Sequence, residues 1–269
     1  MCRRNITAVV LLLLFLAGSL FLAPAGKATG TDISGLDVII LIDQSGSMYG
    51  AGSRGSGNDK HNHRIGQAKN IVYRLAEHVE GTSLVHRVSV IDFGSKASVV
   101  FPSQLRLSFD PGDPGRALRE AKTLAERYLE PKNLRDTNTP EALALGIQEL
   151  DKMDASEALA DRRRVMLILT DGRPDLPGVK SLDVLRSEVT TEADSLKKKD
   201  VGLWVVGLND ADNYWNEGDG EFWEKVAGPG RARLAETSGT SISALVQEIV
   251  NEWLGVKGLA IGKEYECPP

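Results

Sequence analysis

Cysteine is scarce in this chain: Cys2 and Cys267 are the only two among 269 residues. Cys2 lies in front of an N-terminal apolar run, so removal of that run would leave Cys267 alone and exclude a disulfide within the chain. No cysteine of the lipoprotein type follows the apolar run. With 42% hydrophobic residues, the chain is long enough to form one sizeable domain that is stabilised by its core.

Excess positive charge is lacking as well. The formal net charge is −5, and it becomes −7 if Arg3 and Arg4 are removed with the first 25 residues. Because the phosphates of nucleic acids require a basic face, this balance excludes nucleic acid as the expected partner. The sequence also contains no internal repeat and no long low-complexity segment.

The N-terminal apolar run predicts export. It covers residues 6–23 behind two arginines, and Ala23-Pro24-Ala25 is a small-residue site of the kind that signal peptidases cut. We expect residues 1–25 to be a signal peptide. The alternative is an uncleaved membrane anchor, because about 18 apolar residues are near the minimum that spans a bilayer. Either way, we expect the folded part outside the cytoplasm, where it is secreted, periplasmic or at the cell surface.

Apolar strands alternate with amphipathic helices over the rest of the chain. Residues 26–35 are expected to form a short linker, residues 36–254 a single domain, and residues 255–269 a C-terminal tail. The expected strands are residues 38–42, 86–93, 97–101, 164–169, 201–208 and a brief edge strand at 233–235. The expected helices are residues 64–80, 115–129, 139–153, 182–199, 222–227 and 241–253.

This alternation predicts an α/β fold. Strands that are separated by helices form a doubly wound, mainly parallel central sheet with helices on both of its faces. The turn at Gly94-Ser95-Lys96 is the only hairpin-like signal, so it adds one antiparallel strand at an edge of the sheet. In such folds the functional crevice lies outside the carboxyl ends of the strands.

The loop after the first strand carries a set of oxygen ligands. Asp43, Ser45 and Ser47 follow the apolar run 38–42 directly, and Gly46 allows the backbone to turn sharply between them. A carboxylate and two hydroxyls are hard ligands of the kind that Mg²⁺ binds. The sequence therefore places a candidate cation site at the carboxyl end of this strand.

Two further loops add similar side chains. Thr137 lies just before the helix that Pro140 leads, a first-turn position where the missing amide of proline has no cost. Asp171 follows the buried strand 164–169 and is part of Thr170-Asp171-Gly172. Like Asp43, it is expected at the carboxyl end of a strand, where the fold would place a site.

Together these three loops resemble the metal-ion-dependent adhesion site of the von Willebrand factor type A (vWA) domain family. The family pattern consists of D-x-S-x-S, a threonine ahead of a major helix, and the aspartate of T-D-G. All five positions have a match here, namely Asp43, Ser45, Ser47, Thr137 and Asp171. The turn at residues 93–97 is also similar to a hairpin turn of the family, and the resemblance extends over residues 37–253. Arg135-Asp136 stand where many members have two glycines.

The resemblance implies a Rossmann-like fold and a specific chemistry. In the family, the serine and threonine hydroxyls contact the metal, and the aspartates largely hold its waters or orient those hydroxyls. The ion stays under-neutralised and binds an Asp or Glu carboxylate of a protein partner. We therefore expect an exported adhesion or assembly module that holds Mg²⁺, or Mn²⁺, which accepts the same ligands. We do not expect an enzyme, and we expect a membrane contact only through an uncleaved N-terminal segment.

Several positions within the site and around it leave alternatives open. Thr139 competes with Thr137 for the ligand role, but we expect Thr139 to cap the helix that Pro140 leads. Asp136 either adds negative charge near the metal or lies on the surface, and we favour the surface. The metal is either a recognition device or a structural ion of an accessory subunit in an envelope complex.

Three other stretches of the sequence have features of different kinds of site. Residues 50–55 match G-x-G-x-x-G, and a nucleotide-binding or hydrolytic α/β enzyme that uses this stretch is the disfavoured alternative, because its first glycine lies eight residues after the strand. We favour a loop that flanks the metal site. G-x-S-x-G is absent, so Ser45 is not expected to be a nucleophile. His61 and His63 could bind a softer metal, although solvated histidines are the favoured interpretation. The acidic stretch 209–219 is interpreted as a solvated loop rather than a second cation site. Its aromatic neighbours are expected to pack, and these are Trp215, Phe222 and Trp223.

Overall fold

The computed structural model describes residues 33–255, apart from 50–58, 60, 103, 157–160, 210–216 and 237–238. The predicted signal peptide, the G-x-G-x-x-G stretch, Trp215 and Cys267 lie outside the described residues. Within the described part, no helix is both long and apolar enough to cross a membrane.

A seven-stranded sheet forms the centre of the domain, in the order β3-β2-β1-β5-β6-β7, with β4 also paired to β2. The pairs β1–β2, β1–β5, β5–β6 and β6–β7 are parallel, which confirms the predicted α/β fold. The strands are β1 (Gly35–Asp43), β2 (Val85–Phe93), β3 (Ala97–Val99), β4 (Leu105–Ser108), β5 (Arg162–Thr170), β6 (Val201–Asn209) and β7 (Ala232–Glu236).

The antiparallel edge consists of two short pieces. β3 pairs with the end of β2, as the hairpin prediction requires, but it stops at Val99. β4 then pairs with the beginning of β2, between Val85 and Val88. β4 was not predicted, because it has only four residues and only two of them, Leu105 and Leu107, are buried hydrophobic side chains.

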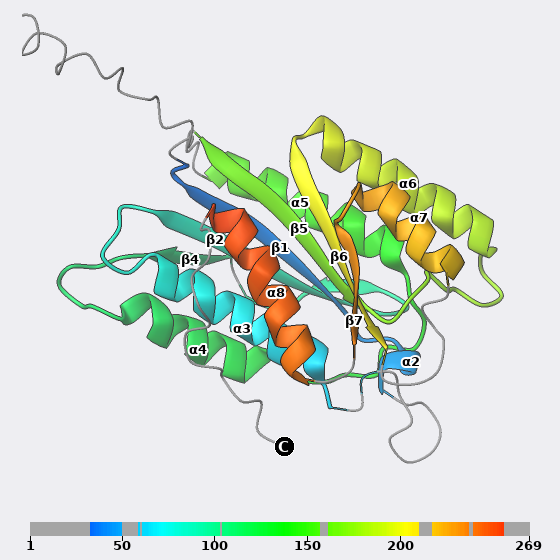
Figure 1. Ribbon diagram of the computed structural model, residues 1–269, viewed down its shortest axis with the longest axis horizontal. Coiled ribbons are helices and arrows are strands. Elements are labelled where there is room, and N and C mark those ends of the chain that lie inside the picture. The colour runs from blue at the N-terminus through cyan, green and yellow to red at the C-terminus, as the bar shows by residue number, and fades with distance from the viewer. Residues whose placement is uncertain are drawn as a thin grey trace, which may run out of the picture. The chain divides into compact units, whose positions relative to one another are not determined.

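Helices cover both faces of the sheet (Figure 1). Helices α3, α4 and α8 lie on one face, and α5, α6 and α7 lie on the other. A single helical turn, α2, was not predicted and lies beyond the end of β1 (Figure 1). The helices are α2 (Gly46–Tyr49), α3 (His63–His78), α4 (Arg116–Tyr128), α5 (Thr139–Ser156), α6 (Leu182–Lys198), α7 (Glu217–Ala227) and α8 (Gly239–Leu254).

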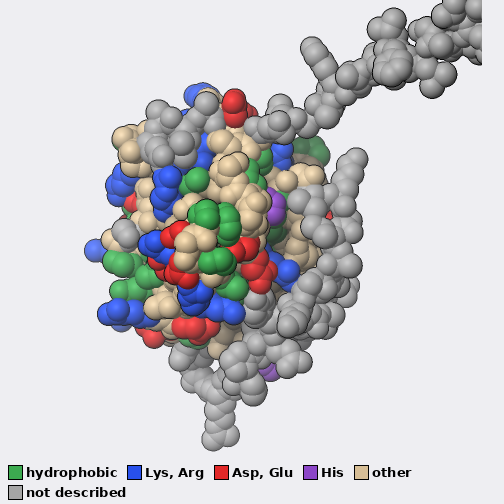
Figure 2. All heavy atoms as spheres, turned by 90° about the vertical axis from the view of Figure 1, so that its left-hand side faces the viewer, with side chains coloured by type: hydrophobic (Ala, Val, Ile, Leu, Met, Phe, Trp, Pro, Cys, Tyr) green, Lys and Arg blue, Asp and Glu red, His purple; other side chains and the backbone are tan. Residues whose placement is uncertain are grey.

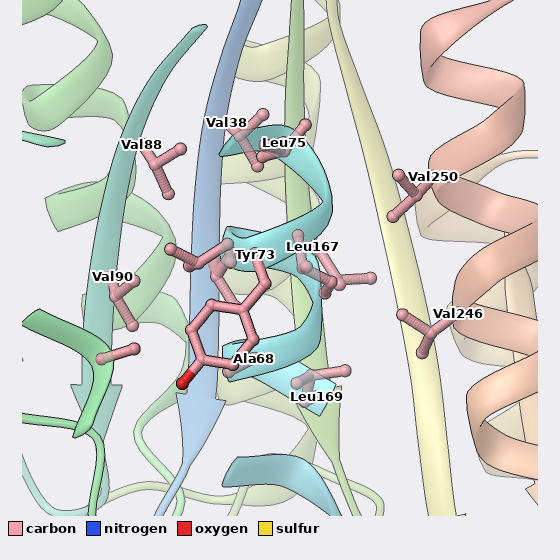
Figure 3. Packing of buried hydrophobic residues seen from close by; sticks show 14 of the residues in the cluster. Val38, Ala68, Tyr73, Leu75, Val88, Val90, Leu167, Leu169, Val246 and Val250 are labelled. Carbon is pink, nitrogen blue, oxygen red and sulfur yellow. The ribbon is translucent and has the colours of Figure 1, made fainter. Parts of the chain in front are cut away.

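The central strand β1 divides its side chains between two cores. Val38 and Ile40 face the helices α3, α4 and α8, whereas Ile39 and Leu41 face α5, α6 and α7. Figure 3 shows the first core, in which α3 contributes Ala68 and Leu75 over β1. Burial of a side chain of this size stabilises the fold by about 1.5–3 kcal/mol, so both faces of β1 contribute to stability along its apolar run.

Close packing also sets the position of α5, the helix that follows the Thr137 loop. A Cβ atom added to Gly146 would lie 2.6 Å from the Cε atom of Met166 and 3.3 Å from the Cγ2 atom of Ile39. Glycine thus allows α5 to approach the sheet closely. The middle of α5 is therefore held close to the middle of β1 and β5.

Charged groups are buried at the opposite end of the sheet, where the parallel strands begin. Asp37 accepts two hydrogen bonds from Arg87, of 2.7 and 2.6 Å, and one of 2.8 Å from Arg162. Burial alone would raise the pKa of Asp37, but the two guanidinium groups outweigh it and lower that pKa. The surface on this side of the molecule carries interspersed basic and acidic side chains (Figure 2).

A pair of histidines lies beside this cluster. The Nδ1 atom of the buried His86 accepts the Leu36 amide at 3.0 Å, and its Nε2 atom lies 3.1 Å from the Nδ1 atom of His78. Because Nδ1 is an acceptor, we assign the proton of the neutral His86 ring to Nε2, which donates to His78. Burial is the main reason that the pKa of His86 falls to about 3, with smaller contributions from the charges of His78 and Arg162.

Candidate functional site

The two candidate aspartates lie at the same edge of the sheet. Asp43 is the last residue of β1, and Asp171 directly follows β5, the neighbouring parallel strand. Both side chains are buried, at 0% and 3% exposure. The strand ends thus bring together two carboxylates that are far apart in the sequence.

The first loop folds around the carboxylate of Asp43. One of its oxygens accepts the Ser45 amide at 2.9 Å, and the other accepts the Thr170 hydroxyl at 2.6 Å. The hydroxyl oxygens of Ser45 and Ser47 are 3.0 Å apart. Ser47 lies in the short helix α2, which starts at Gly46, and this turn brings its hydroxyl next to that of Ser45.

Electrostatics at this edge favour a bound cation. Burial and the nearby charge of Asp171 raise the pKa of Asp43 to about 7, although Thr170 and Ser45 donate hydrogen bonds to it. Two buried carboxylates and adjacent hydroxyls form a set of hard oxygen donors. A divalent cation would remove the repulsion between the two acids, so the residues present fit Mg²⁺ or Mn²⁺.

Thr137 is held between the other two loops. Its amide donates to the Asp175 carbonyl at 2.7 Å, and the Asp175 amide donates back at 2.9 Å. Two residues earlier, the Arg135 carbonyl accepts the Gly46 amide at 2.5 Å. Thr137 itself is only 5% exposed. Backbone hydrogen bonds therefore connect all three predicted loops.

The hairpin turn between β2 and β3 supports the Thr137 loop. The Ser95 amide donates to the Leu134 carbonyl at 2.8 Å, and the Ser95 hydroxyl donates to the Asp136 carboxylate at 2.8 Å. Gly94 lies so close that an added Cβ atom would overlap the Cβ atom of Leu134. Asp136 is half-buried for this reason.

The expectation that Thr139 caps its helix is wrong. Helix α5 begins at Thr139 itself, and the Thr139 hydroxyl is buried without a hydrogen-bond partner among the described residues. Asn138 occupies the position before the helix, where its side-chain amide donates to Glu141 at 2.5 Å. The Ala142 amide donates to the Asn138 carbonyl, which makes Asn138 the capping position and places Thr139 inside the helix.

A buried tryptophan is hydrogen-bonded to the third loop, which contains Thr170, Asp171 and Gly172. The indole nitrogen of Trp223 donates to the Gly172 carbonyl at 3.0 Å, and the ring is fully buried. Phe222 packs edge-on against it, with ring centroids 5.0 Å apart. Both aromatic residues pack as predicted, but the hydrogen bond to the T-D-G turn could not be read from the sequence.

The sequence offered two other candidate metal sites, the acidic stretch 209–219 and the histidines His61 and His63. Asp219 does not belong to a solvated acidic loop as predicted, since it is buried in α7 and pairs with Arg186 at 2.7 Å. The rings of His61 and His63 have centroids 5.6 Å apart. Within the described part of the chain, no three or more histidine, cysteine, aspartate or glutamate side chains are grouped to hold a metal. A site at Asp43 therefore depends on hydroxyl ligands.

Comparisons with known proteins agree with this architecture. The family model of the von Willebrand factor type A domain matches residues 37–217. No curated protein matches the chain.

Several solved structures share the fold. The pilus adhesin SpaC of Lactobacillus rhamnosus GG, in its open conformation, has a TM-score of 0.57 at 16% identity, over 83% of this chain and 30% of its own. A von Willebrand factor type A protein of Catenulispora acidiphila has a TM-score of 0.53 at 17% identity, over 82% and 43%. Proximal thread matrix protein 1 of the mussel byssus has a TM-score of 0.52 at 14% identity, over 82% and 46%.

The chain spans less than half the length of each of these three structures, and at such identities the likeness shows the fold alone. The match to the family model is the stronger finding, because it covers more than half of the chain, including the three loops that carry the candidate ligands. The chain therefore belongs to the von Willebrand factor type A domain family.

Proposed function

We propose that this protein is an exported, non-enzymatic binding module that holds Mg²⁺ and captures a carboxylate of a protein partner. The observation that carries the proposal is the pair of buried carboxylates, Asp43 and Asp171, next to the hydroxyls of Ser45 and Ser47. Two buried carboxylates repel each other when both are ionised, and a bound cation would offset this repulsion.

The chain's own residues have distinct tasks in this proposal. Ser45, Ser47 and Thr137 would hold the cation through neutral hydroxyls. Asp43 and Asp171 would supply negative charge, and the hydrogen bonds from Thr170 and Ser45 keep the Asp43 carboxylate in one orientation. When bound, the cation supplies the positive charge that attracts a carboxylate.

The partner in this proposal is a protein that presents Asp or Glu. The likeness to a pilus adhesin supports an adhesive role, because that protein shares the fold over most of this chain. The apolar residues 6–23 support export, which would place the site where it can meet another protein.

A Mg²⁺ titration by calorimetry tests the metal. The wild type is expected to bind one Mg²⁺ saturably, and Asp43→Ala is expected to lose this binding. The matched control is Asp175→Asn, because Asp175 is an exposed aspartate that supports Thr137 through its backbone alone. Absence of saturable binding in the wild type would refute the metal site.

A displayed random-peptide library tests the partner chemistry. Peptides are captured in Mg²⁺ and eluted with EDTA. The eluted peptides are expected to share an Asp or Glu, and replacement of that residue by its amide is expected to abolish capture. If the metal binds but no EDTA-eluted peptide depends on a carboxylate, the ion is structural and the proposed recognition role is wrong.

A further inference from the structure

The residue between Asp43 and Ser45 has an unusually complete set of contacts. Gln44 is fully buried, and its side-chain oxygen accepts from Arg64 (Nε at 3.3 Å, Nη2 at 3.0 Å) and from the Lys132 amide at 3.0 Å. Its side-chain nitrogen donates to the Glu130 carbonyl at 2.9 Å and to Asp92 at 3.4 Å. Every donor and acceptor of this amide is therefore engaged.

These contacts attach one particular segment to the first metal loop. The Gln44 side chain binds the backbone of Glu130 and Lys132, and the Gln44 carbonyl accepts the Leu134 amide at 2.7 Å. The next bond along the chain joins the Arg135 carbonyl to the Gly46 amide. Residues 130–135 thus lie along the first loop like a short strand, and they lead directly to Thr137.

Charged neighbours determine which way the amide of Gln44 points. Arg64 is itself fully buried and pairs with Asp59 at 2.6 Å, so its remaining donors face the Gln44 oxygen. On the other side, Asp92 pairs with Lys132 at 2.8 Å and presents its second oxygen to the Gln44 nitrogen. A flipped amide would place donors against Arg64 and oxygen against Asp92, so one orientation is strongly preferred.

We propose that Gln44 is a positioning residue, which sets the distance between the first metal loop and Thr137 and thereby the affinity of the site for Mg²⁺. The inference rests on the proposed function, since it assumes that Thr137 and the first loop share one ion. Mg²⁺ requires near-octahedral oxygens at short distances, so a small displacement of one loop weakens the whole site. Loss of comparable supporting residues lowers metal affinity by about 10–100-fold.

The test compares two glutamines. Gln44→Met keeps the volume of the side chain but removes its five hydrogen bonds. Gln104→Met is the matched control, because Gln104 also donates to a backbone carbonyl, that of Glu149, and this hydrogen bond involves none of the three loops. Affinity is measured from the rise in melting temperature with Mg²⁺ concentration, and each variant is also melted in EDTA. We expect Mg²⁺ binding about 10–100-fold weaker in Gln44→Met and unchanged in Gln104→Met.

A purely structural role would give a different result. Gln44→Met would then melt at a lower temperature in EDTA but bind Mg²⁺ as tightly as the wild type, and this outcome would overturn the inference. If Gln44→Met does not fold, Gln44→Asn takes its place, because the shorter side chain cannot reach both Glu130 and Lys132. Unchanged Mg²⁺ affinity in Gln44→Asn would overturn the inference equally.

A double-mutant cycle identifies the residue through which Gln44 acts. In a Thr137→Ala background, Gln44→Met is expected to change the Mg²⁺ affinity less than about twofold, whereas in a Ser47→Ala background it should keep its full effect. Full effects in both backgrounds would overturn the role assigned to Thr137. Failure of the proposed function is distinguishable, because the wild type would then show no saturable Mg²⁺ binding at all.

Discussion

His86 is a group through which mild acid is expected to destabilise this domain. Its ring is fully buried between the Leu36 amide and His78. The ordinary pKa of histidine is 6.5, and burial lowers that of His86 to about 3 in the folded protein. The unfolded chain therefore takes up a proton near pH 6.5 that the folded protein does not bind until about pH 3.

The size of the stability loss follows from the difference between the folded and unfolded pKa values of His86. Because the folded pKa lies below the unfolded one, the unfolded state binds more protons, and stability falls as the pH falls. Each pH unit below 6.5 lowers the free energy of unfolding by about 1.4 kcal/mol until the pH approaches 3. Between pH 6.5 and about pH 5, His86 alone removes about 2 kcal/mol, a large share of the roughly 5–15 kcal/mol of a typical domain.

The variant His86→Asn isolates this effect. The Oδ1 atom of asparagine is separated from Cα by as many bonds as Nδ1 of histidine, so it can still accept the Leu36 amide, but it does not titrate. The assay is urea unfolding of both proteins in EDTA at a series of pH values. The loss of the bond to His78 is expected to make the variant about 1 kcal/mol less stable than the wild type near neutral pH.

The quantity to compare is the difference in the free energy of unfolding between the wild type and His86→Asn at each pH. Asp43 titrates in the opposite sense, since its raised pKa makes the metal-free protein more stable as the pH falls through 7, but it does so in both proteins. As the pH falls from about 7.5 to 5, the stability of the variant relative to the wild type is expected to rise by about 2 kcal/mol, which turns its deficit of about 1 kcal/mol into an advantage of about 1 kcal/mol. A deficit that stays constant over this range would show that protonation of His86 does not destabilise the domain.

Three further predictions concern the metal site. In EDTA above pH 7, Asp43→Asn should be more stable than the wild type by on the order of 3 kcal/mol, because it removes a buried charge that faces Asp171, and it should not be stabilised by Mg²⁺. Gly94→Ala should weaken Mg²⁺ binding by about tenfold or more, because the added methyl group displaces Leu134. Arg135→Gly should stabilise the protein by about 1 kcal/mol, because the φ angle of Arg135 is +69°.

Thermal melts with and without Mg²⁺ check all three changes. An Asp43→Asn protein that is less stable than the wild type in EDTA at high pH would show that the two acids do not repel each other in the folded state. Gly81→Ala is a control for Gly94→Ala, since a Cβ atom at Gly81 meets nothing within 4 Å, although its φ of +70° gives it a backbone cost of its own. Equal Mg²⁺ affinity in both alanine variants would contradict the buttressing role of the turn.

The strands and the candidate ligands could be predicted because their signals are local. The run 38–42 is apolar at every position, which only a strand with two buried faces requires, and β1 is buried throughout. Asp43 and Asp171 follow such runs directly, so the parallel topology was enough to place both at one edge of the sheet.

Other features depend on partners that are distant in the sequence. Gln44 looks like an ordinary loop residue until Arg64, Asp92 and Lys132 surround it, and none of these neighbours can be inferred from spacing. Asp219 looks solvated beside other acids, but Arg186 from another helix makes its burial tolerable. The capping role of Thr139 was predicted wrongly, because sequence propensities do not locate the first residue of a helix to within one position.

The amino-acid sequence alone is enough to establish the α/β alternation, the two-sided burial of the central strands and the kinds of ligand available at their ends. These properties follow from residue type and period, which every segment carries alone. The connections between the loops depend on the packed domain instead, because the hydrogen bonds of Gln44, Ser95 and Trp223 join segments that lie about 40 to 90 residues apart. The burial that raises the pKa of Asp43 and lowers that of His86 is likewise a property of the packed domain, since it requires all the layers that exclude water.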